Sequence, residues 1–129
     1  MPPARTGYLG AVIQHVTFEI RREQAEDCVG FYRLLGFEPA DPPPSLRDRA
    51  AWVGRGGTQI HLMWVDDPVT LPRGHVAVVP DDYDATLERL RGEGHDPEPR
   101  REHWGAPRSY VHDPAGNLVE ILAFPPPGA

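Results

Sequence analysis

Three histidines and one glutamate, residue types that bind divalent metals, recur at matching intervals along this chain of 129 residues. His15 and His61 are 46 residues apart, and His75 and Glu120 are 45 residues apart. Each lies in a short run rich in valine, isoleucine and leucine, where a buried imidazole or carboxylate costs free energy unless something compensates for its burial. A shared cation would compensate for all four, so the spacing predicts a duplicated module that holds one metal ion.

Size, charge and cysteine content restrict the class of protein. The chain is about one domain long, and its net charge of −6, with 19 acidic and 13 basic residues, argues against nucleic acid as a partner. No apolar run approaches the roughly 20 residues of a membrane span, so no membrane association is expected. Cys28 is the only cysteine, and no apolar signal segment precedes the first predicted strand. We therefore expect a soluble, cytoplasmic protein without an internal disulfide.

The chain divides into two halves with the same predicted order of elements. Each half predicts a strand, a helix and two or three further strands, with one candidate ligand near the first strand and one in the last. In the first half the predicted elements are a strand at 12–20, a helix at 23–35 and strands at 50–53 and 58–65. In the second half they are a strand at 75–79, a helix from about 82 to 92 and strands at 109–112 and 118–124.

The alternation of side chains along a strand predicts which residues share a face with the candidate ligands. His15, Thr17 and Glu19 share one face of the first strand, and His61 and Met63 share one face of the fourth predicted element. We therefore expect Thr17 and Met63 to contact a substrate, and Glu19 to be a candidate general base.

The second half supplies further candidates. Trp104 and Tyr110 are expected at the mouth of the pocket as substrate contacts. Glu120 is expected to act both as a metal ligand and as the group that moves a proton. Cys28 falls among helical core positions, which predicts a buried thiol rather than a nucleophile.

Two segments of the chain resemble the vicinal oxygen chelate superfamily, which includes glyoxalase I, extradiol dioxygenases, fosfomycin-resistance enzymes and bleomycin-resistance proteins. QHV at 14–16 with FYRLLGF at 31–37 resembles the opening strand and the end of the first helix of that family, and DPAGNLVEI at 113–121 resembles its closing turn and strand. The resemblance spans about residues 12–124. It implies an α+β fold of two tandem βαβββ modules, whose curved mixed sheets enclose a metal and substrate cavity, usually in a homodimer.

The same resemblance sets the expected boundaries and ligands. It implies one domain at 12–124, with module one at about 12–66, module two at about 74–124, and tails at 1–11 and 125–129. By position, His15 and His75 match the first-strand ligands of the two modules. Glu120 matches the last-strand glutamate of module two, and His61 matches the last ligand position of module one.

The function implied is that of a lyase or isomerase of the glyoxalase I type. One divalent ion, Zn, Ni, Co, Mn or Fe, would chelate two adjacent oxygens of a small oxygenated metabolite and make a neighbouring C–H more acidic. Glyoxalases carry an arginine four residues after the first ligand and an asparagine four residues after the second. This chain has Glu19 and Val65 there, which argues against glutathione recognition.

Three alternatives remain open at this point. An extradiol-type iron dioxygenase would use His15, His75 and Glu120 as ligands, with His61 as a base beside them. A metal-free binding protein, similar to the bleomycin-resistance proteins, would hold a drug or metabolite on aromatic side chains; the candidates are Trp52, Trp64 and Trp104. Fosfomycin modification would need a phosphonate-binding cluster, and none is readable in the sequence.

Overall fold

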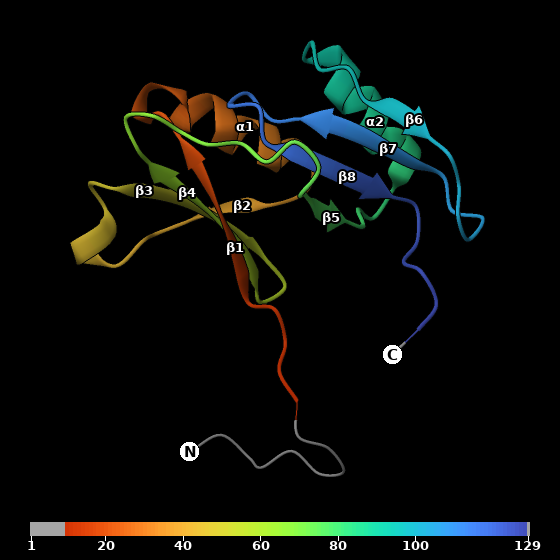
Figure 1. The fold of residues 1–129 in the computed structure, drawn as a ribbon, viewed down its shortest axis with the longest axis horizontal. Helices are drawn as coiled ribbons and strands as arrows, with labels where there is room; N and C mark the ends of the chain where they lie inside the picture. Colours follow the sequence, from red (N-terminus) through yellow and green to blue (C-terminus); the bar gives the residue numbers. More distant parts are fainter. Residues whose placement is uncertain (1–9, 129) are drawn as a thin grey trace.

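A computed structural model describes residues 10–128, so most of the predicted N-terminal tail and residue 129 lie outside the described part of the chain. The chain forms two modules that lie side by side (Figure 1). The first contains β1 (His15–Ile20), α1 (Ala25–Leu34), β2 (Glu38–Ala40), β3 (Ala50–Arg55) and β4 (Thr58–Trp64). The second contains β5 (Val76–Val78), α2 (Tyr83–Gly92), β6 (Glu98–Arg100), β7 (Arg108–His112) and β8 (Leu118–Leu122). Two short 3₁₀ helices are Arg22–Gln24 and Pro44–Leu46.

The two sheets have the same strand order, with the first strand of each module placed beside its last strand. The orders are β1-β4-β3-β2 and β5-β8-β7-β6. β1 pairs in parallel with β4, β5 pairs in parallel with β8, and the other neighbours are antiparallel. Both sheets are curved and remain open, which confirms the predicted α+β fold of two tandem βαβββ modules.

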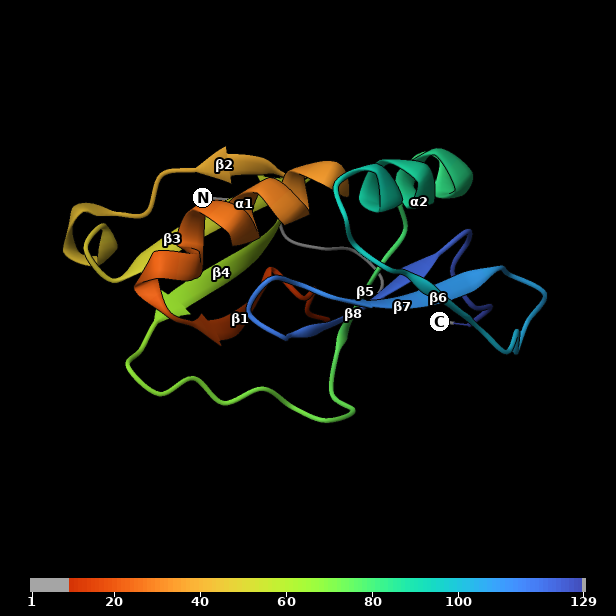
Figure 2. The same ribbon diagram turned by 90° about the horizontal axis from the view of Figure 1, so that it is seen from above.

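The helices and the linker lie on opposite sides of the sheets. Figure 2 shows α1 and α2 on one side, while the linker at 65–75 passes on the other. Asp82 begins α2 by accepting a hydrogen bond of 3.0 Å from the Ala85 N–H, as its position in the sequence predicted. Gly36 follows α1 with a φ of 102°, a left-handed conformation that favours glycine.

One hydrophobic core fills the space between the helices and the sheets. Phe31 and Tyr32 of α1 are buried in the same cluster as Val119 and Ile121 of β8, so the two modules share their core. The opposite faces of the sheets are more open, and Met63 on β4 is 45% exposed. Burial of apolar area on the helix side therefore supplies the stability, and the other face is available for a ligand.

The burial pattern confirms the predicted faces of β1 and β4, two neighbouring strands of module one. On β1, Thr17 is exposed whereas Ile20 is buried. On β4, Leu62 is buried whereas His61 is only half-buried. The predicted ligand residues thus face away from the core, on the open side of the sheet.

Some boundaries differ from the predicted ones. The 3₁₀ helix Pro44–Leu46 forms where no helix or strand was predicted, because proline is well suited to the first turn of a helix. β3 continues to Arg55, two residues beyond its predicted end, and Gly56 and Gly57 form the turn that follows it. β7 begins at Arg108 rather than at Ser109, and the Arg108 side chain binds the predicted ligand Glu120.

Side-chain hydrogen bonds join the modules at the edge of the core. The Tyr32 hydroxyl of α1 donates a hydrogen bond of 2.7 Å to Asp113 in the turn before β8. The Asn117 side-chain amide donates to the backbone carbonyl of Glu19, at 3.3 Å. Neither of the two α-helices in the described residues is long and apolar enough to cross a membrane.

Candidate metal centre

His75 and Glu120 form one close pair of predicted ligands. His75 directly precedes β5, and Glu120 lies in the middle of β8, where it pairs in register with Ala77. Because β5 and β8 are parallel neighbours, the two side chains meet on the open face of the second sheet. His75 Nε2 lies 3.0 Å from Glu120 Oε1, and Glu120 is 7% exposed.

The hydrogen bonds of His75 show what this pair can hold. His75 Nδ1 lies 2.7 Å from the backbone carbonyl of Arg73, which can only accept, so Nδ1 carries a proton. In the neutral imidazole Nε2 then bears a lone pair that faces the carboxylate oxygen. The contact is favourable only when a cation lies between the two atoms, either a proton on Nε2 or a metal ion. Orientation of Nε2 by an Nδ1–H bond to a carbonyl is typical of metal-binding histidines, so this pair fits a divalent ion.

Arg108 is part of the same cluster and was missed by the sequence reasoning. Its Nη1 donates to Glu120 Oε2 at 2.9 Å, and only 10% of its side chain is exposed. It also donates to the backbone carbonyl of Arg101 at 2.7 Å and contacts His103 Nε2 at 3.2 Å. Hydrogen bonding to the Tyr110 side chain, followed by the bond to Glu120, raises the pKa of Arg108, so it stays charged. Glu120 is therefore compensated by a guanidinium on one oxygen, and its other oxygen faces His75.

His15 and His61 form the second pair of predicted ligands, on the open face of the first sheet. Their rings stack with centroids 4.0 Å apart, and Trp52 stacks on His61 at 3.8 Å. Since β4 lies between β1 and β3, His61 is held between the other two rings. His61 Nε2 bonds to Gln59 Oε1 at 2.8 Å, which leaves Nδ1 for another partner. Burial, and then the neighbouring His15, lower the pKa of His61.

The stacking limits how this pair can bind an ion. An imidazole ligand directs its lone pair within the plane of its ring. The planes of His15 and His61 are inclined by only 17° and separated by a stacking distance, so they do not meet near either ring. In this arrangement one of the two rings, not both, can bind a given ion. His15 at the exposed start of β1 is bonded through Nδ1 to Gln14 Oε1 at 2.8 Å, whereas His61 is held by both Trp52 and Gln59.

The four predicted donors therefore lie in two pairs rather than in one group. Within residues 10–128 of a single chain, no three side chains of histidine, cysteine, aspartate or glutamate are arranged to hold a metal ion. His15 lies with His61 on the first sheet, and His75 lies with Glu120 on the second. A centre that combines donors from both pairs would need more than one copy of the chain.

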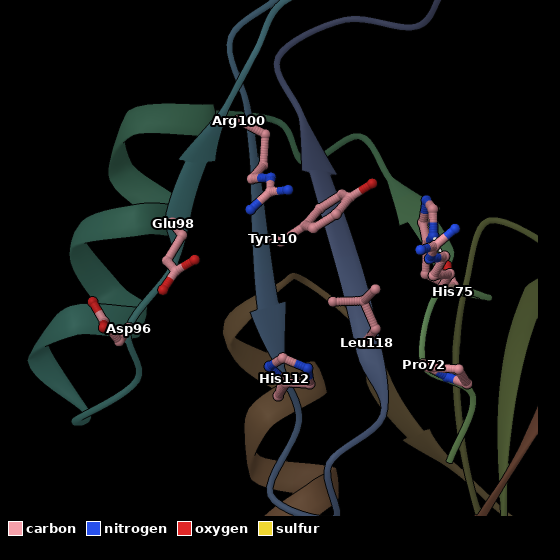
Figure 3. Close-up of a pocket in the computed structure, with 9 residues that line it drawn as sticks. Pro72, His75, Asp96, Glu98, Arg100, Tyr110, His112 and Leu118 are labelled. Atoms are coloured by element: carbon pink, nitrogen blue, oxygen red, sulfur yellow. Dashed lines mark hydrogen bonds between the residues drawn. The ribbon is translucent and has the colours of Figure 1, made fainter.

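A pocket lies on the open face of each sheet. The pocket on the second sheet has a volume of about 550 Å³, and His75, Arg100 and Tyr110 are among its lining residues (Figure 3). The pocket on the first sheet has a volume of about 390 Å³ and includes Thr17, Trp52, His61 and Met63 in its lining. Thr17, Met63 and Tyr110, three predicted substrate contacts, thus line a pocket beside a predicted ligand.

The remaining predicted site residues are engaged elsewhere. Glu19 Oε1 accepts a hydrogen bond of 2.9 Å from the backbone N–H of Val69, which fastens the linker to β1. Trp104 donates from Nε1 to the carbonyl of Phe124 at 3.1 Å, so it packs near the end of the chain. Cys28 is fully buried in the core, and burial raises the pKa of its thiol to about 12.

Comparisons with known proteins identify the family to which this fold belongs. The chain belongs to the Glyoxalase/Bleomycin resistance protein/Dioxygenase superfamily, whose family model matches residues 12–121. It is similar to Glyoxylase I 4 of Arabidopsis thaliana, at 26% identity over 121 residues that cover 84% of this chain and 68% of that protein.

Two solved structures show the same fold. A glyoxalase family protein from Bacillus anthracis has a TM-score of 0.79 and 25% identity, and the match covers 92% of this chain and 98% of that one. Lactoylglutathione lyase from Agrobacterium tumefaciens has a TM-score of 0.66 and 21% identity, with 88% and 93% of the two chains covered. The second match is a likeness of fold alone.

Proposed function

We propose that this protein is a divalent-metal-dependent enzyme of the glyoxalase I type, acting as a lyase or isomerase on a small oxygenated metabolite. Superfamily members typically bind a divalent ion and a small-molecule substrate. The observation that carries the proposal is the position of His75, whose Nδ1 bonds to the Arg73 carbonyl while Nε2 faces Glu120 Oε1. Either a proton on Nε2 or a metal ion would stabilise this contact, and the proposal takes the metal ion.

Two copies of the chain complete the site in this proposal. His75 and Glu120 of one copy would hold the ion together with His15 of another copy, because the two pairs are separate within one chain. His61 would stay stacked between His15 and Trp52, where it limits the movement of the His15 ring. A homodimer is the simplest assembly that pairs both modules in this way.

The residues of the chain then have distinct roles. When bound, the ion supplies a Lewis acid that polarises a carbonyl oxygen of the substrate. We assign proton transfer to Glu120, because it borders the pocket residue His75 and is held in place by Arg108. Glu19 is less suitable as the base, because its carboxylate binds the linker backbone. Tyr110 lines the pocket beside His75 and would contact the substrate.

A second candidate function follows from the stacking of His15 and His61. Because only one of these rings can bind the ion, the proposed ligands are two histidines and one glutamate, which is also the set used by non-haem iron oxygenases. An extradiol-type dioxygenase would then use His61 as a base beside the ligands. Iron in the purified protein and oxygen uptake with a catechol would favour this function over an isomerase.

Metal content tests the proposal directly. Elemental analysis of untagged protein should find a divalent metal, and His75→Ala and Glu120→Gln should each remove most of it while the chain stays folded. His75→Ala deletes an imidazole donor, and Glu120→Gln removes the negative charge of its partner. His112→Ala is the matched control, because His112 lines the same pocket and is not bonded to Glu120, so its metal content should stay at the wild-type value.

The opposite result would be equally clear. Wild-type protein that purifies without metal, and whose melting temperature does not respond to divalent ions, would exclude both metal-dependent functions. It would favour a metal-free binding protein with Trp52 as a stacking surface. Equal metal content in wild type, His75→Ala and Glu120→Gln would show that the metal binds elsewhere.

A further inference from the structure

Arg108 gives the second module a fixed positive charge directly beside a predicted metal ligand. Its guanidinium binds the Glu120 oxygen that does not face His75, at 2.9 Å, and both side chains are about nine-tenths buried. Further bonds to the Arg101 carbonyl and to His103 fix the guanidinium in place. Glu120 thus has one oxygen engaged by a permanent cation and one oxygen directed at His75.

Burial strengthens the attraction between Arg108 and Glu120. An ion pair shielded from water interacts much more strongly than one on the surface. Glu120 is compensated by Arg108 even when nothing is bound between Glu120 and His75, so the carboxylate can stay buried without a metal. The same positive charge opposes the entry of a second cation next to Glu120, and it occupies the oxygen that a two-oxygen ligand would need.

We infer that Arg108 is a positioning residue that restricts Glu120 to binding through Oε1 and lowers the affinity of the site for divalent metal, while keeping the ligand pair assembled in the metal-free protein. This inference rests on the metal dependence proposed above. According to this inference, the burial of Glu120 and the binding of a metal by Glu120 depend on different cations. The carboxylate needs a cation in order to be buried, and Arg108 supplies it independently of the metal.

Affinity for Co²⁺ tests this inference, because Co²⁺ binding is measured by calorimetry and by visible absorption without any substrate. Arg108→Met removes the charge but keeps an apolar stem, and we expect it to bind Co²⁺ about 10-fold or more tightly than wild type. Arg108→Lys keeps the charge and should stay within about 3-fold of wild type. Arg100→Met is the control, because Arg100 lies over the same Tyr110 ring, at 4.9 Å, without bonding to Glu120. Its affinity should equal that of wild type.

Thermal melts provide a second measurement. Without metal, Arg108→Met should melt below Arg100→Met, and Co²⁺ should raise its melting temperature by more than it raises that of wild type. If Arg108→Met does not fold, Arg108→Gln replaces it as the variant without charge.

The possible failures can be told apart. A wild-type protein that binds Co²⁺ together with an Arg108→Met or Arg108→Gln variant of equal or weaker affinity overturns this inference and leaves the proposed function intact. Absence of Co²⁺ binding in wild type and in all variants overturns the metal dependence, and this inference with it.

Discussion

Cys28 illustrates how the surroundings of a single residue decide its chemistry. The thiol is fully buried, and burial, followed by the charge of Asp113, raises its pKa from 9.0 to about 12. We expect a disulfide reagent at pH 8 to label it at least about 100-fold more slowly in the folded protein than in urea, because the thiolate is scarce and shielded. Since the pKa is raised on folding, this thiol also makes the protein less stable as the pH rises above about 9. Labelling at equal rates in both states would contradict the placement of Cys28 in the core.

The candidate site could be predicted from the sequence only in part. His15, His61, His75 and Glu120 stand out because they are polar residues inside apolar strands, and three of the four predicted substrate contacts line pockets. Arg108 was missed because an arginine at the edge of a strand usually lies in solvent, and the strand was predicted to begin one residue later. Once Arg108 is placed in β7, it lies on the same open face as Tyr110, because both alternate with the buried Ser109.

Helix α1 is connected to the second module by one buried hydrogen bond, and this bond has a measurable contribution to stability. Tyr32 is fully buried and donates to the carboxylate of Asp113 at 2.7 Å. We expect Tyr32→Phe to lower the free energy of unfolding by about 1.5–3 kcal/mol, the range for hydrogen bonds to charged groups. Urea denaturation followed by circular dichroism measures this change.

Tyr83→Phe is the matched comparison for this prediction. The Tyr83 hydroxyl bonds to the neutral Ser109 hydroxyl at 2.6 Å, and Tyr83 is only half-buried. Its loss should therefore be smaller, about 0.5–1.5 kcal/mol. A loss from Tyr83→Phe as large as that from Tyr32→Phe would show that the charge of Asp113 contributes little at this junction.

The elements themselves were predictable wherever one periodicity dominates. β1 and β4 alternate strictly, and α2 begins at an aspartate cap. β2 and the 3₁₀ helix Pro44–Leu46 were missed because three residues show no period, whereas the equally short β5 lies within the longer apolar run 75–79. Pairing with β3 creates β2, and that is a tertiary contact that local sequence does not encode.

For the molecule as a whole, the separation of the two donor pairs predicts a specific result when defective chains are combined. His15→Ala disables module one and His75→Ala disables module two, so neither variant alone should bind metal. If each site joins module one of one copy to module two of another, a mixed dimer regains one intact site of two. Random pairing makes half of the dimers mixed, so an equal co-expression should restore about one quarter of the wild-type metal content.

A different tag on each chain allows the mixed dimers to be purified away from the unmixed ones before the metal is measured. The doubly tagged fraction should contain about half of the wild-type metal per chain, because every dimer in it is mixed. The His15→Ala protein purified alone provides the baseline. A doubly tagged fraction that stays at this baseline would argue that the copies do not share their sites.

Because one face of each strand packs in the core and the other lines a pocket, the ligand specificity of such a protein can change without a change in the core. On β1, β4 and β7 the residues that bury apolar area point toward the helices, while Thr17, Met63 and Tyr110 point toward the pockets. Random variation confined to those three positions would explore new ligands while the packing that supports folding stays constant. A combinatorial library at Thr17, Met63 and Tyr110 should therefore yield mostly folded proteins, which makes this scaffold well suited to directed evolution.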